Sequence, residues 1–308
     1  MMDETQKTIA LRRLCGDVVR FTHFLGGLSL RNYQQAVARA IIDSVVHQRG
    51  LSFVVMFPRQ SGKNELQAQI EVYLLALLGE RHAEMVKVSP TYQPQSLNAM
   101  RRIERALQAN LVTRNHWQRH AGNLYQYRNA RLTFLSGAPE SNIVGATAST
   151  LLEVDEAQDV SIAKYDKEIA PMAASTNATR VFWGTAWTSR TLLARELCAA
   201  RVAEEADGVQ RVFRASAEEV GQEVPAYRAF VNAQVARLGR TNPLVRTQFF
   251  SEEIDAEGGL FTRQRIALMQ GSHPDVCTRC WWTWRGRTRR CAVWRRACLP
   301  TLDAMRPR

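Results

Sequence analysis

Short apolar runs alternate with amphipathic segments along most of this chain. The apolar runs predict buried strands at residues 52–57, 85–88, 131–135, 151–154, 180–184 and 209–214. Apolar positions at helical spacing predict helices at residues 6–26, 32–48, 64–78, 95–108, 191–202, 225–239 and 243–250. Strands that alternate with helices indicate an α/β fold in three layers, with helices covering both faces of a largely parallel central sheet.

Composition divides the chain into two unequal parts. From Ser272 onward it carries nine arginines and two aspartates, with four of the six cysteines and four of the seven tryptophans. This accounts for more than half of the net charge of +12. The mild positive charge of the preceding residues fits either simple solubility or a weak attraction to a polyanion such as DNA, and charge alone does not choose between them.

The sequence predicts neither a membrane span nor a secretion signal. No apolar stretch approaches the length that spans a bilayer, and the first residues, MMDETQKTIALRRL, lack the apolar core of a secretion signal. We therefore expect a cytoplasmic protein without a membrane partner.

A glycine–lysine loop follows the first predicted strand. Gly62 and Lys63 end the segment Phe57–Lys63 and precede a predicted helix. Loop amides and a lysine in this setting can hold phosphates. The pattern departs from G-x-x-x-x-G-K-[ST], because Phe57 replaces the first glycine and Asn64 replaces the hydroxyl residue. The alternative is an ordinary turn with a solvated lysine.

Two adjacent carboxylates, Asp155 and Glu156, follow the predicted strand at 151–154. A carboxylate at the end of a strand can hold Mg²⁺, and its neighbour can polarise a water molecule. The alternative is an acidic loop in solvent, but the apolar residues of the run favour a buried strand. With the lysine loop earlier in the chain, the pair predicts hydrolysis of a nucleoside triphosphate, with ATP and Mg²⁺ as cofactors.

These motifs together resemble the large terminase subunit of tailed bacteriophages and prophages, the ATP-driven motor that moves DNA into a viral shell. Arg59 and Gln60 precede Gly62 and Lys63, and the acidic motif reads Leu-Glu-Val-Asp-Glu-Ala-Gln from Leu152. Further segments similar to this family lie at 30–34, 89–92, 136–139, 145–147 and 184–186. The resemblance covers roughly residues 30–262 and implies a P-loop NTPase domain over residues 1–262.

The resemblance also implies a role for individual residues. The expected catalytic residues are Glu156, Arg59 and Lys63. The expected ATP-binding residues are Tyr33, Gln34, Arg59, Gln60, Ser61, Gly62, Lys63 and Asn64, with Gln34 reading the adenine edge and Tyr33 packing nearby. Asp155 and Asn64 are expected to hold the metal, and Thr185 to couple hydrolysis to movement. Alternatives remain: a helix with Tyr33 in the core, a surface salt bridge at Arg59, and a buried strand-end threonine at position 185.

The function implied is ATP hydrolysis that drives double-stranded DNA translocation during phage genome packaging. The partners implied are double-stranded DNA, the portal protein and the small terminase subunit, with a homo-oligomeric ring forming on the portal. Two alternatives remain: a helicase-like ATPase, and an inactive prophage remnant that binds nucleotide without motor activity.

The segment 263–308 is expected to replace the ribonuclease-H-like nuclease domain of this family, with loss of nuclease activity. One interpretation is a zinc site, because Cys277 and Cys280 have ligand spacing, although Cys291 and Cys298 do not repeat it. The interpretation that we favour is an out-of-frame translation. The codons of Cys280-Trp281-Trp282-Thr283, read two bases later, encode Leu-Val-Asp, which suits the first strand of a nuclease domain.

Overall fold

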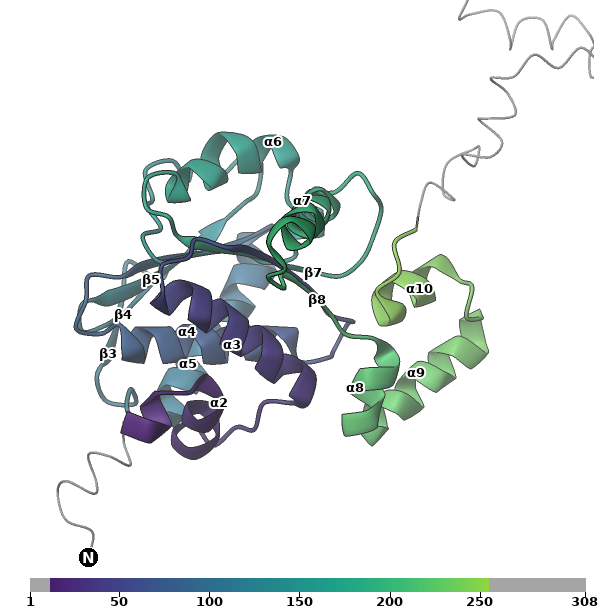
Figure 1. Ribbon diagram of the computed structural model, residues 1–308, viewed down its shortest axis with the longest axis horizontal. Coiled ribbons are helices and arrows are strands. Elements are labelled where there is room, and N and C mark those ends of the chain that lie inside the picture. The colour runs from purple at the N-terminus through teal and green to yellow at the C-terminus, as the bar shows by residue number, and fades with distance from the viewer. Residues whose placement is uncertain (1–11, 255–308) are drawn as a thin grey trace, which may run out of the picture. The chain divides into compact units, whose positions relative to one another are not determined.

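The central feature of the computed structural model, which describes residues 12–254, is an eight-stranded sheet (Figure 1). The strand order is β3-β4-β5-β2-β6-β7-β1-β8. Every pairing from β5 to β8 is parallel, and β3 and β4 add an antiparallel edge. The strands are β1 (Ser52–Met56), β2 (Glu84–Ser89), β3 (Trp117–His120), β4 (Leu124–Tyr127), β5 (Ala130–Ser136), β6 (Leu151–Val154), β7 (Thr179–Gly184) and β8 (Val212–Arg214).

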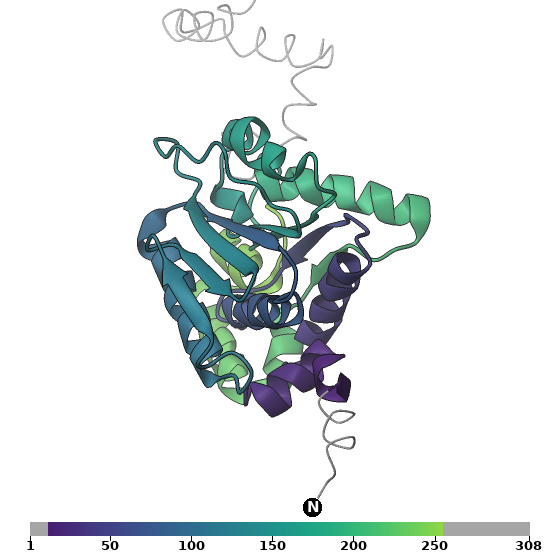
Figure 2. The ribbon, with the colours of Figure 1, turned by 90° about the vertical axis from the view of Figure 1, so that its left-hand side faces the viewer.

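Helices cover both faces of the sheet. Helices α2 to α5 lie on one face, and α6 and α7 lie on the other (Figure 1). Figure 2 shows the same layers from the end of the sheet that carries β3 to β5. The helices are α2 (Val18–Arg20), α3 (Asn32–Val46), α4 (Lys63–Leu77), α5 (Leu97–Ala109), α6 (Ile162–Lys164), α7 (Leu192–Asp207), α8 (Ala217–Glu223), α9 (Pro225–Leu238) and α10 (Pro243–Phe250).

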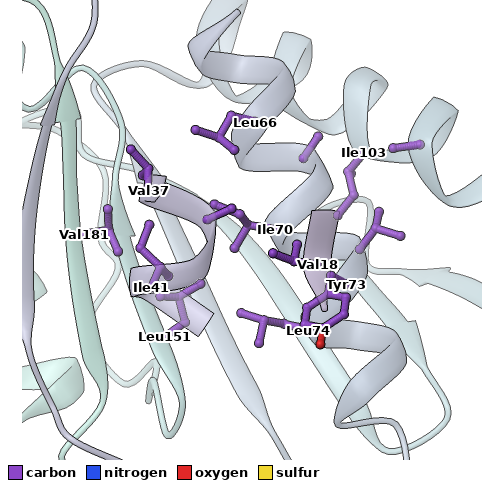
Figure 3. Close-up of a cluster of buried hydrophobic side chains, with 14 of the residues drawn as sticks. Val18, Val37, Ile41, Leu66, Ile70, Tyr73, Leu74, Ile103, Leu151 and Val181 are labelled. Atoms are coloured by element: carbon purple, nitrogen blue, oxygen red, sulfur yellow. The ribbon is translucent and has the colours of Figure 1, made fainter. Parts of the chain in front are cut away.

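Alternating side chains of the parallel strands pack into two separate hydrophobic cores, one on each face of the sheet. On β1, Phe53 and Val55 pack towards α3 and α4, whereas Val54 and Met56 pack towards the α7 side. Figure 3 shows the first core, in which α4 contributes a continuous buried stripe against the sheet. Because strands that are buried on both faces are largely apolar, the apolar runs of the sequence correctly predict these strands, although β2 and β6 each bury one charged residue, Lys87 and Glu153. The predicted three-layer α/β fold is confirmed.

The sheet order brings the two predicted motifs to one edge. Strand β7 lies between β1 and β6, with Met56 paired with Gly184 and Val154 paired with Phe182. Neighbouring strands are about 4.8 Å apart, so β1 and β6 lie about 10 Å apart. The carboxyl ends of β1, β6 and β7 therefore meet at the same edge of the sheet, where the loops that follow them can share one ligand.

Several elements differ from the sequence-based prediction. The predicted helix at 6–26 is interrupted at Asp17, whose carboxylate accepts a hydrogen bond from Arg20 N and starts a new helix. The hairpin of β3 and β4 was not predicted, because its strands have only four residues each and β3, at the sheet edge, is largely polar and exposed. Helical turns from Ile162 to Ala173 and helix α8 were also missed.

Some predictions fall on residues that the structure does not describe. The segment 263–308, with the candidate zinc ligands Cys277, Cys280, Cys291 and Cys298 and the out-of-frame interpretation, lies outside the described residues, as does the predicted domain boundary at 262. Within residues 12–254, no helix is both long and apolar enough to cross a membrane.

Candidate functional site

A cavity of about 500 Å³ lies at the carboxyl ends of β1, β6 and β7. Five residues that were predicted as site residues line it: Arg59, Asn64, Asp155, Glu156 and Thr185. The remaining wall is formed by Pro94, Gln95, Asn98, Gln158, Asp159, Ala186, Trp187 and Gln248. The fold therefore brings together residues from loops that are distant in the sequence, as a ligand site at the carboxyl edge of a parallel sheet requires.

The lysine loop has the backbone of an anion cradle. Gln60 and Gly62 both adopt left-handed conformations, with φ of 60° and 88°, and helix α4 begins directly afterwards at Lys63. A Cβ atom on Gly62 would lie 2.8 Å from Gln34 Nε2 and 2.9 Å from Arg31 Nη1. Glycine is thus required here by the backbone angle and also favoured by the close side chains. The free amides at the start of α4 can hold an anion.

Three side chains at the start of α3 donate hydrogen bonds to backbone carbonyl groups of this loop. Arg31 Nη1 and the Tyr33 hydroxyl donate to Ser61 O at 2.8 and 2.6 Å, and Gln34 Nε2 donates to Gly62 O at 3.0 Å. Gln34 Oε1 accepts from Arg31 N at 2.9 Å. The predicted contact of Gln34 and Tyr33 with adenine stays a prediction. The bracing role of Arg31 was missed, since no local pattern marks it.

Phe57, which replaces the first glycine of the usual loop pattern, is a core residue. Its side chain is buried and meets the Tyr33 ring edge to face, with 5.3 Å between the ring centroids. The aromatic pair anchors the entrance of the loop to α3. The departure from the usual pattern therefore has a packing reason.

Lys63 and Glu156 form an ion pair at the centre of the site. Lys63 Nζ lies 2.7 Å from Glu156 Oε1, and only 7% of the lysine side chain is exposed. Glu156 has a left-handed backbone, with φ 44° and ψ 50°. A non-glycine residue in this region costs on the order of 1–3 kcal/mol, and such strain is concentrated at functional sites.

Asp155 lies beside this pair at the end of β6. It is almost fully buried, and its Oδ1 accepts a hydrogen bond from Gln67 Nε2 at 3.0 Å. Asp155 and Asn64 line the same cavity and offer the carboxylate and amide oxygens that suit Mg²⁺. Within residues 12–254, no group of three or more His, Cys, Asp or Glu side chains is arranged for a metal. A sparse protein ligand set fits Mg²⁺, which takes its other ligands from water and substrate phosphates.

A buried polar network supports Asp155 from the core. Lys87 Nζ donates to Gln67 Oε1 at 2.6 Å and to Glu71 Oε1 at 2.7 Å. The cation fixes the orientation of the Gln67 amide, so that its NH₂ group faces Asp155. Burial alone would lower the pKa of Lys87, but the neighbouring carboxylates, Glu71 first, raise it above its ordinary value. Sequence reasoning missed this network, because its members lie on α4 and β2.

Glu153 belongs to the same buried region. Its side chain is fully buried, which is inconsistent with the alternative of a solvated acidic loop, and Trp183 Nε1 donates to its Oε1 at 2.8 Å. Burial, and then the charge of Glu71, raise the pKa of Glu153 well above its ordinary value.

Arg59 and Thr185 complete the cavity. The backbone N–H of Arg59 donates to Gln248 O at 2.8 Å, while its guanidinium group is exposed and pairs with no carboxylate of residues 12–254. Thr185 is buried at the end of β7, and its backbone N–H donates to Gln158 Oε1 at 3.2 Å. Gln60 is exposed, and Ser61 Oγ donates to Pro58 O at 2.6 Å.

No protein-family model and no curated protein matches this chain. Solved structures do match it. The ATPase domain of the large terminase of Thermus phage P74-26 aligns with a TM-score of 0.57 at 16% identity, over 76% of this chain and 98% of that one. The large terminase of bacteriophage HK97 aligns with a TM-score of 0.63 at 15% identity, over 78% of this chain and 55% of that one.

A third match is the large terminase of a thermophilic bacteriophage in complex with ADP. Its TM-score is 0.53 at 9% identity, over 71% of this chain and 52% of that one. The alignments thus span about half the length of the HK97 protein and of this ADP-bound protein. At these identities they show that this chain has the fold of large terminase ATPase domains.

Proposed function

We propose that this chain is a Mg²⁺-dependent ATPase of the large terminase type. The observation that carries the proposal is that Asp155 and Glu156 line one cavity and that Lys63, from the loop on the other side of β7, forms an ion pair with Glu156 there. Such an arrangement would put a cation, a carboxylate for the metal and a second carboxylate within reach of one triphosphate, which supports the proposal. The ADP complex of the terminase from the thermophilic phage supports a nucleotide as the ligand.

Catalysis by this site is a matter of positioning and electrostatics. Lys63 and the free guanidinium group of Arg59 would neutralise negative charge on the phosphates. Asp155 and Asn64 would hold Mg²⁺, which neutralises phosphate charge when bound. Glu156 would orient the attacking water and accept its proton. A triphosphate offers Lys63 a new anionic partner, and the Glu156 oxygen that Lys63 now occupies becomes available to that water.

We further propose that hydrolysis drives the movement of double-stranded DNA, with Thr185 passing the state of the site to β7. The supporting observation is the fold shared with phage large terminases. The portal protein and the small terminase subunit would be the protein partners, and the chain would act as a homo-oligomeric ring.

The proposal is tested with the full chain of 308 residues. Phosphate release from ATP is measured with and without Mg²⁺, followed by displacement of a third strand from a DNA triplex. We expect Mg²⁺-dependent turnover, and triplex displacement without separation of the duplex. Nucleotide binding without turnover would overturn the ATPase in favour of an inactive remnant. Separation of the duplex strands would overturn the packaging motor in favour of a helicase.

A further inference from the structure

The side-chain amide of Gln158 bridges two parts of the site that lie on different strands. Its Nε2 donates to Glu156 Oε2 at 2.8 Å, and its Oε1 accepts from the backbone N–H of Thr185 at 3.2 Å. Glu156 follows β6, whereas Thr185 follows β7. Gln158 thus links the Glu156 carboxylate directly to the end of the neighbouring strand.

Gly184 leaves room for this amide at the end of β7. A Cβ atom on Gly184 would lie 2.4 Å from Gln158 Oε1 and 2.5 Å from Leu193 Cδ2. Both distances are far shorter than a carbon atom allows. The absent side chain at position 184 therefore makes the space in which the amide lies, which a purely solvated glutamine would not need.

Gln158 also separates two carboxylates. Its Nε2 donates to Asp159 Oδ2 at 3.2 Å as well as to Glu156. Burial, and then the charge of Glu156, raise the pKa of Asp159 above its ordinary value. The amide NH₂ group supplies positive partial charge between the two acids, and a carboxylate in its place would repel both.

We propose that Gln158 is a positioning residue, which holds the carboxylate of Glu156 in its working orientation and links it to the end of β7. This inference rests on the proposed ATPase function. The two oxygens of Glu156 have different partners: Lys63 binds Oε1 and Gln158 binds Oε2. When a triphosphate draws Lys63 away, Gln158 still holds Oε2, and Oε1 remains directed at the water. A movement of Glu156 would then be transmitted to Thr185 through the hydrogen bonds of the same amide.

The experiment compares Gln158→Leu and Gln158→Glu in the full chain. Leucine removes both hydrogen bonds, whereas glutamate keeps the acceptor for Thr185 N and loses the donor to Glu156. A displaced catalytic group can cost on the order of 10²-fold in rate. We expect kcat for ATP to fall by about 10- to 100-fold in both variants. In Gln158→Leu, which adds no charge to the cavity, the affinity for a fluorescent ADP analogue should stay within about two-fold of wild type.

Amide hydrogen exchange at Thr185 gives a readout that does not depend on turnover. We expect faster exchange in Gln158→Leu, because the N–H loses its acceptor, and exchange close to wild type in Gln158→Glu. A matched control is Gln126→Leu on β4, since Gln126 is also half-buried and bonded to Arg128 O at 2.6 Å and to Arg131 Nε at 3.2 Å, far along the sheet. This control should leave kcat and Thr185 exchange unchanged.

The outcomes separate this inference from the proposed function. Wild-type kcat in both Gln158 variants would overturn the positioning role. A loss of ADP affinity in Gln158→Leu that matches the loss of kcat would overturn it too, because it would indicate general damage to the site. A wild-type chain without any ATPase activity would overturn the proposed function instead. In that case, unchanged hydrogen exchange of the Thr185 amide in Gln158→Leu would show that Gln158 does not bridge the two strands.

Discussion

Lys63 Nζ lies 2.7 Å from Glu156 Oε1, although the two residues are 93 positions apart in the chain. The pair joins the first turn of α4 to the loop after β6, and only 24% of the Glu156 side chain is exposed. Each residue has a partner for its charge before any ligand arrives. The fold alone therefore holds together the cation that we propose binds phosphate and the carboxylate that we propose orients water.

The roles that we propose for Lys63 and Glu156 can be tested separately by mutation. We expect Glu156→Gln to lower kcat for ATP by about 10²- to 10⁴-fold, because a general base is lost, while nucleotide binding persists. Lys63→Ala should weaken both turnover and nucleotide affinity, because in the proposed mechanism the cation contacts the phosphates themselves. Phosphate release and equilibrium binding of a fluorescent ADP analogue measure the two effects. The exposed Lys167→Ala serves as the control. Full turnover in Glu156→Gln would contradict the assignment.

Asp155 should set the magnesium requirement of the reaction. We expect EDTA to abolish ATP turnover and an excess of Mg²⁺ to restore it. Asp155→Asn keeps the oxygen that accepts from Gln67 but removes the negative charge. It should therefore raise the Mg²⁺ concentration for half-maximal turnover by at least about ten-fold, since Mg²⁺ prefers charged oxygen ligands. A titration of turnover against Mg²⁺ measures this, with the exposed Asp166→Asn as control. An unchanged Mg²⁺ titration in Asp155→Asn would show that Asp155 does not bind the metal.

The side-chain amide of Gln34 already binds Arg31 N and Gly62 O. We expect Gln34→Leu to weaken the binding of ATP and GTP by a similar factor, because the lysine loop loses a brace rather than a base-reading group. Competition binding with the two nucleotides tests this. A loss confined to ATP would instead support the adenine contact that the family resemblance implies.

The buried cation of Lys87 should be important for stability. Lys87 and Glu71 are 2% and 1% exposed, and their ion pair spans 2.7 Å. Breaking a buried pair by removal of one partner costs about 3–5 kcal/mol, because the other charge stays buried and uncompensated. We expect Lys87→Met to lower the free energy of unfolding by this amount in a urea titration. The exposed pair of Arg49 and Asp43 provides the contrast, since Arg49→Met should cost about 1 kcal/mol or less.

The raised pKa of Glu153 predicts that the free energy of unfolding depends on pH. Burial and Glu71 raise its pKa in the folded chain, so the folded state keeps a proton that the unfolded chain releases above the ordinary pKa of 4.5. The folded state then binds more protons, and the free energy of unfolding falls as the pH rises towards the raised pKa.

In Glu153→Gln this proton linkage is absent, while Trp183 keeps an oxygen to which it can donate. We expect the decline in the free energy of unfolding between about pH 5 and about pH 8 to be smaller in this variant than in wild type. Urea titrations across this range test the sign, with Glu140→Gln at the surface as control. An identical decline in both proteins would show that Glu153 is ionised throughout.

The sequence by itself determined the strands of the parallel sheet and the two motifs at their ends. Apolar runs such as 52–57 and 151–154 are buried on both faces, so no other element suits them, and local chemistry marks Lys63, Asp155 and Glu156 directly. The sequence did not predict the hairpin of β3 and β4, since strands of four residues are too short to give a clear periodic signal. It also placed Gln34 and Tyr33 near a base, without the loop contacts that the structure shows.

Only the tertiary structure decided which side chains meet. Strand order depends on packing between segments that are distant in the chain, and no local pattern encodes the insertion of β7 between β1 and β6. That insertion brings Thr185 to Gln158. The contacts of Gln67 with Lys87 and Asp155 likewise follow from the packing of α4 on β2 and β6. Charged and amide side chains that are far apart in the sequence interact strongly only when folding brings them together and removes water from between them.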